Sequence, residues 1–145
     1  MSHVAFAQLR RSAHDCRRHK TNLLPLPRRI TDVLSLEYHA LLEALRMGWG
    51  SLYALKHLTR VALATTFLAR SGYGDLDGMI FSELLDDLSK VYVRAEETGV
   101  YVFDTPLFER FAKLVTVHDR QLQAAPVRLI EVIAQKVECY GERCT

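Results

Sequence analysis

Residues 52–70 read LYALKHLTRVALATTFLAR and are apolar on nearly every side between Val61 and Ala69. A helix that is apolar all round lies buried inside a bundle, whereas a surface helix carries a single apolar stripe. Glycines on both sides of Trp49 end the preceding segment, and Ser51 is a suitable N-cap for a helix that starts at residue 52. We therefore predict a central, buried helix over residues 52–70.

Four further segments carry apolar residues at three- and four-residue intervals, the pattern of a helix with one buried face. They cover residues 31 or 32 to 47, residues 78–97, a stretch that begins at Thr105-Pro106, and a stretch opened by Pro126. Residues 100–103 (VYVF) are β-prone, but a single four-residue strand has no evident partner, so we expect an extended connector that packs its aromatic side chains on the bundle. The sequence predicts an all-α, single-domain bundle of about five helices, in which the helices 52–70 and 78–97 are antiparallel neighbours, as are the last two.

Charge divides the chain into two parts. Residues 1–30 carry seven Lys and Arg against the single acid Asp15, a net of +6, and the other 115 residues carry twelve basic and sixteen acidic side chains, a net of −4. Two prolines within residues 24–27 (LPLP) separate the parts, because proline removes a helix donor and biases its predecessor toward extended geometry. We predict a basic N-terminal arm over residues 1–29, partly helical or disordered, and a helical bundle domain over residues 30–145.

Composition bounds the class of protein. One domain is usual for 145 residues, and 49% apolar residues suffice for a core. No apolar run approaches the roughly 20 residues of a membrane span, and no secretory signal is visible. Three cysteines without a CxxC pair fit a reducing compartment. We expect a cytoplasmic protein that does not enter a membrane.

The basic arm has two interpretations. Its cations could neutralise phosphates and bind DNA or RNA without sequence preference. Alternatively, they form a solvated tail or dock on an acidic surface of this chain or of a partner, and we favour this second interpretation. The acids between Asp75 and Glu97 are one such surface, because only Lys90 and Arg94 accompany them. The candidate residues for binding nucleic acid or an acidic partner are Arg10, Arg11, Arg17, Arg18, Lys20, Arg28 and Arg29.

Enzyme chemistry is not indicated by any motif. The glycines at 72 and 74 lack the third glycine and the Lys-Ser/Thr of a phosphate-binding loop, and the chain has no Glu-x-x-His of a di-metal bundle. His118 falls on the buried stripe of the helix that begins at residue 105, and Asp119 faces away from that stripe. Because a buried His is usually hydrogen-bonded within the core, we predict structural polar roles for both, with no catalytic residue, metal or cofactor. The alternative is an enzyme centred on His118, which needs a nucleophile or carboxylate converging on it.

Aromatic residues provide the candidate protein interface. Trp49 is either tucked over the end of the bundle or left exposed as an interface anchor, and we favour the tucked arrangement. Tyr73 and Tyr101, which lie in connecting segments, are the other two candidates.

Several short motifs together resemble a known group of sequences. They are HALLEALRMGWG at residues 39–50, LARSGYGD at residues 68–75, GVYVF at residues 99–103 and VHDRQL at residues 117–122. In this order they resemble small α-helical hypothetical proteins of proteobacterial plasmids and prophages, which also tend to open with a basic stretch. The resemblance implies a bacterial mobile-element origin, and it assigns no activity and no functional residue.

These observations lead to one main expectation and two alternatives. We expect a non-enzymatic accessory or regulatory factor that binds another protein. The first alternative is a nucleic-acid-binding accessory protein that uses the basic arm, and the second is the enzyme centred on His118.

Overall fold

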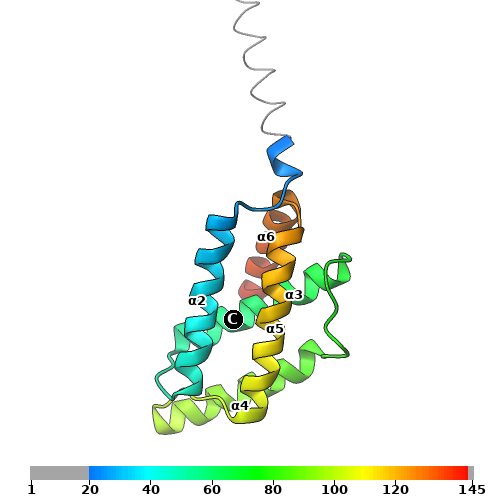
Figure 1. Cartoon of the computed structure of the whole chain (residues 1–145). Coiled ribbons are helices and arrows are strands. Elements are labelled where there is room, and N and C mark those ends of the chain that lie inside the picture. The colour runs from blue at the N-terminus through cyan, green and yellow to red at the C-terminus, as the bar shows by residue number, and fades with distance from the viewer. Residues whose placement is uncertain (1–19, 144–145) are drawn as a thin grey trace, which may run out of the picture.

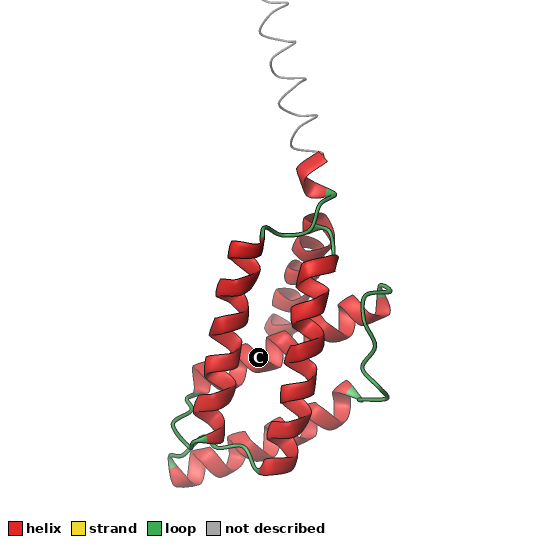
Figure 2. Ribbon diagram, in the orientation of Figure 1, coloured by secondary structure: helices red, strands yellow, loops and turns green. Residues whose placement is uncertain are grey.

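The computed structural model describes residues 20–143, which form a helical bundle without any strand (Figure 2). In chain order the helices are α2 (Arg28–Arg46), α3 (Leu52–Arg70), α4 (Phe81–Thr98), α5 (Thr105–Ala124) and α6 (Val127–Arg143). Residues 20–22 form a further helical segment before them. The all-α class is confirmed for the described residues, with one helical segment more than the five helices expected. Residues 1–19, which make up most of the predicted arm, lie outside them.

Helix α3 lies at the centre of the bundle and contacts α2, α4, α5 and α6 (Figure 1). Its residues Leu58 and Ala62 are fully buried, and they share one apolar core with Leu45 of α2 and Phe111 of α5. Burying a side chain the size of Leu or Phe stabilises the fold by about 1.5–3 kcal/mol. The prediction of a central, buried helix over residues 52–70 is therefore confirmed, including its bounds.

The starts of two helices differ from the predicted ones. Helix α2 starts at Arg28 rather than Thr31 or Asp32, directly after Pro27, whose φ of −56° and ψ of 139° suit the residue before a helix. Helix α4 starts at Phe81 rather than at residue 78. The reason is that Asp77 and the following glycine both have positive φ, 49° and 75°, which a right-handed helix excludes.

Helix α6 packs on α3 and not along α5. Its side chains Ile133 and Val137 join Leu63 of α3 in a second, smaller apolar cluster. Ala125, between α5 and α6, has extended backbone and is fully buried, so the chain turns away from α5. The predicted pairing of the last two helices is therefore wrong. Helices α3 and α4 are in contact and run in opposite directions, as predicted (Figure 1).

The proline-rich segment before α2 is tied to the rest of the bundle. The Val127 N–H at the start of α6 donates to the Leu24 carbonyl at 2.9 Å, and Leu26 packs against the main core. Arg28 and Arg29, which the sequence placed in the arm, belong to α2. The described end of the predicted arm is therefore part of the folded structure.

The segment between α4 and α5 is an extended connector, as predicted. Tyr101 pairs with Gly50 in an isolated antiparallel bridge, and the Phe103 N–H donates to the Leu45 carbonyl at 2.9 Å. Phe103 is buried and Tyr101 is partly buried against the core. These contacts place the connector beside the turn that joins α2 to α3.

Candidate functional site

The turn between α2 and α3 carries the single tryptophan of the chain. Helix α2 ends in a Schellman motif, in which the Gly48 N–H donates to the Leu45 carbonyl at 3.4 Å and the Trp49 N–H donates to the Ala44 carbonyl at 2.9 Å. Gly48 has a φ of 79°, a conformation that favours glycine because other residues pay a steric penalty there. The motif therefore sets the direction of the chain on the N-terminal side of Trp49.

Gly50, on the C-terminal side of Trp49, lies in close contact with the rest of the bundle. A Cβ atom at this residue would lie 2.3 Å from Leu45 Cδ2 and 2.8 Å from the Tyr101 carbonyl oxygen, so only glycine fits. Because Leu45 and the connector occupy the inner side of the turn, Trp49 lies on the outer side with 79% of its surface exposed. The tucked arrangement favoured by the sequence is wrong, and the exposed arrangement is the one observed.

Other exposed apolar side chains lie at the same end of the bundle. Met47, the C-cap of α2, is 49% exposed, and Tyr53, in the first turn of α3, is 60% exposed. Val100 of the connector is exposed beside Gly48. We call Met47, Trp49, Tyr53 and Val100 the Trp49 surface.

Two of the three predicted interface residues are not exposed anchors. Tyr73 is partly buried against the cluster that α6 forms with α3, and Tyr101 is partly buried against the main core. Of the three residues, only Trp49 has most of its surface exposed.

His118 is buried, as its position on the inner stripe of the helix predicts, with 6% of its surface exposed. The Thr65 hydroxyl donates to the Val61 carbonyl at 2.6 Å, so it accepts from His118 Nδ1 at 3.0 Å. The Gln121 amide donates to the carbonyls of Thr65 and Tyr73, which leaves its oxygen to accept from the same Nδ1 at 3.3 Å. This pattern assigns the neutral ring with its proton on Nδ1, and burial lowers the pKa of His118 to about 4.

Asp119 faces α2 and not the solvent, contrary to the prediction that it points away from the packed side. Its carboxylate accepts a short hydrogen bond from the Tyr38 hydroxyl and a second from His39 Nε2 at 2.8 Å. Burial opposes ionisation of this carboxyl, but hydrogen bonds from Tyr38, His39 and Ser35 outweigh it and lower its pKa. Burial and the bond to Asp119 raise the pKa of Tyr38. Asp119 therefore joins α5 to α2 as an ionised acceptor.

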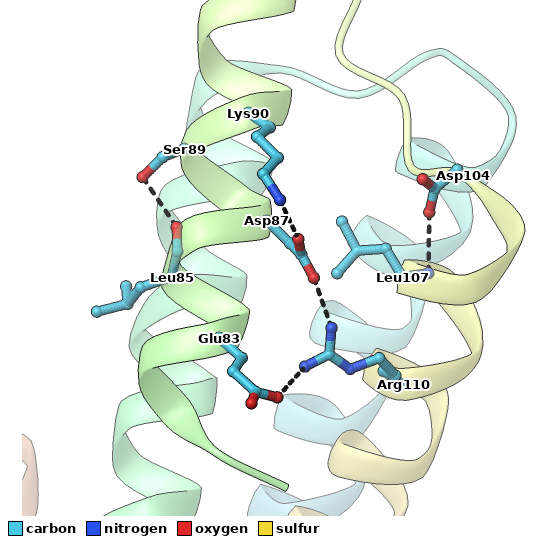
Figure 3. A network of polar contacts seen from close by, with 8 residues as sticks. All are labelled: Glu83, Leu85, Asp87, Ser89, Lys90, Asp104, Leu107 and Arg110. Carbon is cyan, nitrogen blue, oxygen red and sulfur yellow. Dashed lines mark hydrogen bonds and ion pairs between the residues drawn. The ribbon is translucent and has the colours of Figure 1, made fainter.

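The acids of α4 are neutralised more fully than the sequence suggested. Figure 3 shows the Arg110 guanidinium of α5 between two of them: its Nη1 lies 2.5 Å from Asp87 Oδ2 and its Nη2 lies 3.8 Å from Glu83 Oε2. Lys90 donates to the other oxygen of Asp87 at 3.0 Å, and the bonds from Lys90 and Arg110 lower the pKa of Asp87 despite partial burial. Arg94 donates to a carbonyl of the connector instead of pairing with an acid. Of the two cations that accompany these acids in the sequence, Lys90 therefore binds one of them and Arg94 does not.

Three of the seven predicted basic site residues are described. Lys20, Arg28 and Arg29 are all exposed, and Arg28 Nε lies 4.0 Å from Asp32. Arg10, Arg11, Arg17 and Arg18 lie outside the described residues. The described residues thus place part of the basic charge at the end of the bundle where the chain enters α2 (Figure 1).

Within residues 20–143, no group of three or more His, Cys, Asp or Glu side chains is arranged to hold a metal ion. None of the described helices is both long enough and apolar enough to span a bilayer.

Sequence reasoning missed a second apolar row on α2. Val33 and Leu36 are exposed, at 67% and 73% of their surface, and lie outside the one buried stripe that the sequence predicts for this helix. The signal was present, because Val33, Leu36 and Ala40 recur at three- and four-residue intervals beside the stripe that enters the core.

These features define an all-α bundle with an apolar core, a small buried polar cluster around His118 and an exposed tryptophan turn. No family model, no curated protein and no solved structure matches the chain, so its function is inferred from this geometry.

Proposed function

We propose that the chain is a non-enzymatic protein-binding module, an accessory or regulatory factor of the kind carried by bacterial mobile elements, and that Trp49 anchors its partner. The exposure of Trp49 on a turn held from both sides carries this proposal. Tryptophan is enriched among the few residues that dominate protein–protein affinity. A side chain whose backbone is already ordered also loses less conformational freedom on binding.

The Trp49 surface indicates what kind of partner fits. Met47, Trp49 and Val100 present apolar atoms, and the Tyr53 hydroxyl donates to Glu37 at 2.8 Å at the polar edge. An apolar core with a polar rim is the common anatomy of a protein interface. The partner should therefore offer an apolar pocket for one indole ring, bordered by hydrogen-bonding groups.

Capture from a lysate of the source organism tests this proposal. The full chain and its Trp49→Ala variant are immobilised and the bound proteins are quantified. The matched control is Tyr92→Ala, which removes an exposed aromatic residue (41% exposed) from α4. Partners that depend on Trp49 should be lost by at least about tenfold in the first variant and retained in the control. Equal capture by all three proteins contradicts the proposal.

Tryptophan fluorescence provides a second readout, because Trp49 is the only tryptophan. A hydrated indole emits at longer wavelength than a buried one. We expect long-wavelength emission from the free protein and a shift to shorter wavelength when a purified partner binds. An emission spectrum that a partner leaves unchanged places its binding site elsewhere.

The charge of the N-terminal segment supports a second candidate function, nucleic-acid binding by the arm. Residues 1–30 have a net charge of +6, and the described members Lys20, Arg28 and Arg29 are exposed. Binding to generic duplex DNA should weaken steeply between about 50 and 200 mM salt. A chain without residues 1–19 keeps the anchored segment around Leu26 and should lose most of this binding. Binding that ignores salt or survives the deletion contradicts this candidate.

A further inference from the structure

The outer side of α2 carries a row of exposed side chains at heptad spacing. Arg29, Val33, Leu36, Ala40 and Glu43 follow one another at intervals of four, three, four and three residues, and all five are exposed. This is the spacing by which one helix packs along another. The inner side of α2 is already occupied by α3 and α5. In Figure 1, α2 lies at the left of the bundle with α5 to its right, and the exposure of all five side chains shows that no described residue covers the row.

The order of side chains in the row is self-complementary. The cation Arg29 stands at one end and the anion Glu43 stands at the other, with the apolar residues Val33, Leu36 and Ala40 between them. Glu43 also accepts from Arg46 of its own helix, but this ion pair is exposed, and exposed pairs are weak enough for the carboxylate to accept from a second guanidinium. We propose that a second copy of this chain binds here, with its α2 antiparallel to the first around a two-fold axis beside Leu36. A two-fold interface uses the same patch on both subunits, so a patch with this charge order can pair with itself.

The antiparallel direction follows from charge and from size. It places Arg29 opposite Glu43 of the partner subunit, twice, and it places the larger Val33 opposite the smaller Ala40 of the partner subunit. A parallel pair would bring Arg29 against Arg29 of the partner subunit and Glu43 against Glu43 of the partner subunit, which is repulsive. Electrostatic complementarity of this kind fixes the register of an interface.

A shallow apolar groove continues the row at the N-terminal end of α2. Pro27, Ile30, Val33 and Leu34 are among the residues that line it. In the antiparallel arrangement this end lies next to the C-terminal end of the partner's α2. Met47 stands there with 49% of its surface exposed, and its flexible side chain suits an irregular groove. In the proposed dimer, Met47 of the partner subunit therefore fills this groove.

The size of the face sets the expected strength of association. Residues 29–43 cover about 21 Å of helix. One helix face of this length lies below the standard interface of about 800 Å² per partner, so we expect a dissociation constant in the micromolar range. Trp49 lies beyond the C-terminal end of α2, outside the row, so the dimer leaves the indole itself available. This inference does not rest on the proposed function, although Met47 belongs both to the Trp49 surface and to the dimer face.

Analytical ultracentrifugation of the full chain tests the dimer over about 5 to 500 μM, a range that brackets a weak interface. We expect concentration-dependent dimerisation that Leu36→Lys weakens by at least about tenfold. Val93→Lys is the matched control, because Val93 is 56% exposed on α4, away from the row. A monomer across the whole range, or equal weakening by both variants, overturns the proposal.

Charge reversal tests the antiparallel register. Arg29→Glu alone and Glu43→Arg alone should each weaken dimerisation, and the double variant should recover most of the loss, because it restores opposite charges across the axis. Circular dichroism of each variant confirms that the helices remain intact. A double variant weaker than either single variant overturns the antiparallel register.

Cross-linking tests the position of the axis. In a chain with Cys16, Cys139 and Cys144 replaced by Ser, Leu36→Cys should form an intermolecular disulfide on oxidation and Val93→Cys should not. The absence of a Leu36→Cys cross-link at concentrations where the dimer forms overturns the axis. If instead the full chain is monomeric and becomes dimeric only after deletion of residues 1–19, that segment of the same chain covers the face and the second-copy proposal fails.

Discussion

Acid should destabilise the bundle through His118. This side chain is buried, and its Nδ1–H already donates to Thr65 and Gln121, so a second proton would place an uncompensated charge in the core. Burial lowers the pKa of His118 from 6.5 to about 4. Between these two pH values the unfolded chain binds a proton that the folded chain does not bind. The free energy of unfolding therefore falls as the pH falls through this window.

The magnitude follows from the two pKa values. Their separation, from 6.5 to about 4, corresponds to about 3 kcal/mol when the whole window is crossed. This is a large share of the roughly 5–15 kcal/mol by which a domain is stable. Above pH 6.5 the group is neutral in both states and contributes no pH dependence. The carboxylate of Asp119 has a lowered pKa, so its stabilisation is lost only at still lower pH, as the pH falls through the folded-state value.

Urea unfolding at about pH 7.5 and about pH 4.5 measures this loss in the native chain and in His118→Asn. Asparagine keeps a donor near the position of Nδ1 but does not titrate. The variant is less stable at neutral pH because it leaves a cavity, yet its loss on acidification should be smaller than that of the native chain by about 2 kcal/mol. The other histidines are the same in both proteins, so their contributions cancel in the comparison. Equal losses in the two proteins would refute the neutral, buried state of His118.

Two further substitutions test the packing of the site. Gly50→Ala places a Cβ against Leu45 and the connector backbone and should lower the free energy of unfolding in urea by about 2 kcal/mol or more. The control is Gly141→Ala in α6, where the space around the glycine is open, and this change should be neutral or stabilising by up to about 1 kcal/mol. A Gly50→Ala chain of native stability would show that the turn is loosely packed. Tyr38→Phe removes a donor from Asp119 and should cost about 1–2 kcal/mol. It should also raise the pKa of Asp119, followed by NMR titration of the carboxyl carbon, and an unchanged pKa would show that this bond is not formed in solution.

Sequence reasoning succeeded where local chemistry decides the structure. The bounds of α3 follow from Ser51, whose hydroxyl caps the helix, and from an apolar pattern that no exposed helix carries. The burial of His118 follows from its place on the inner stripe of α5. In each case the deciding residues lie within a few positions of the feature that they determine.

Sequence reasoning failed where contacts between residues distant in the sequence determine the structure. Trp49 is exposed because Leu45 and Tyr101 occupy the space inside its turn, and no local pattern reveals that the connector carrying Tyr101 pairs with this turn. Asp119 faces α2 because Tyr38 and His39 meet it there, eighty or so residues away along the chain. Local periodicity identifies a buried face but leaves open which helix will cover it.

The attachment of α6 has a consequence for how the molecule opens. Among its described residues, only Ile133 and Val137 are buried, and most of its contacts with other helices are with α3. Elements with so few buried apolar contacts unfold locally at free energies below that of the whole domain. Helix α6 should therefore exchange its amide protons ahead of α3 and act as a separate cooperative unit. The Val127 N–H at the start of α6 donates to the Leu24 carbonyl, so each local unfolding of α6 also breaks this hydrogen bond between the N-terminal segment and the bundle.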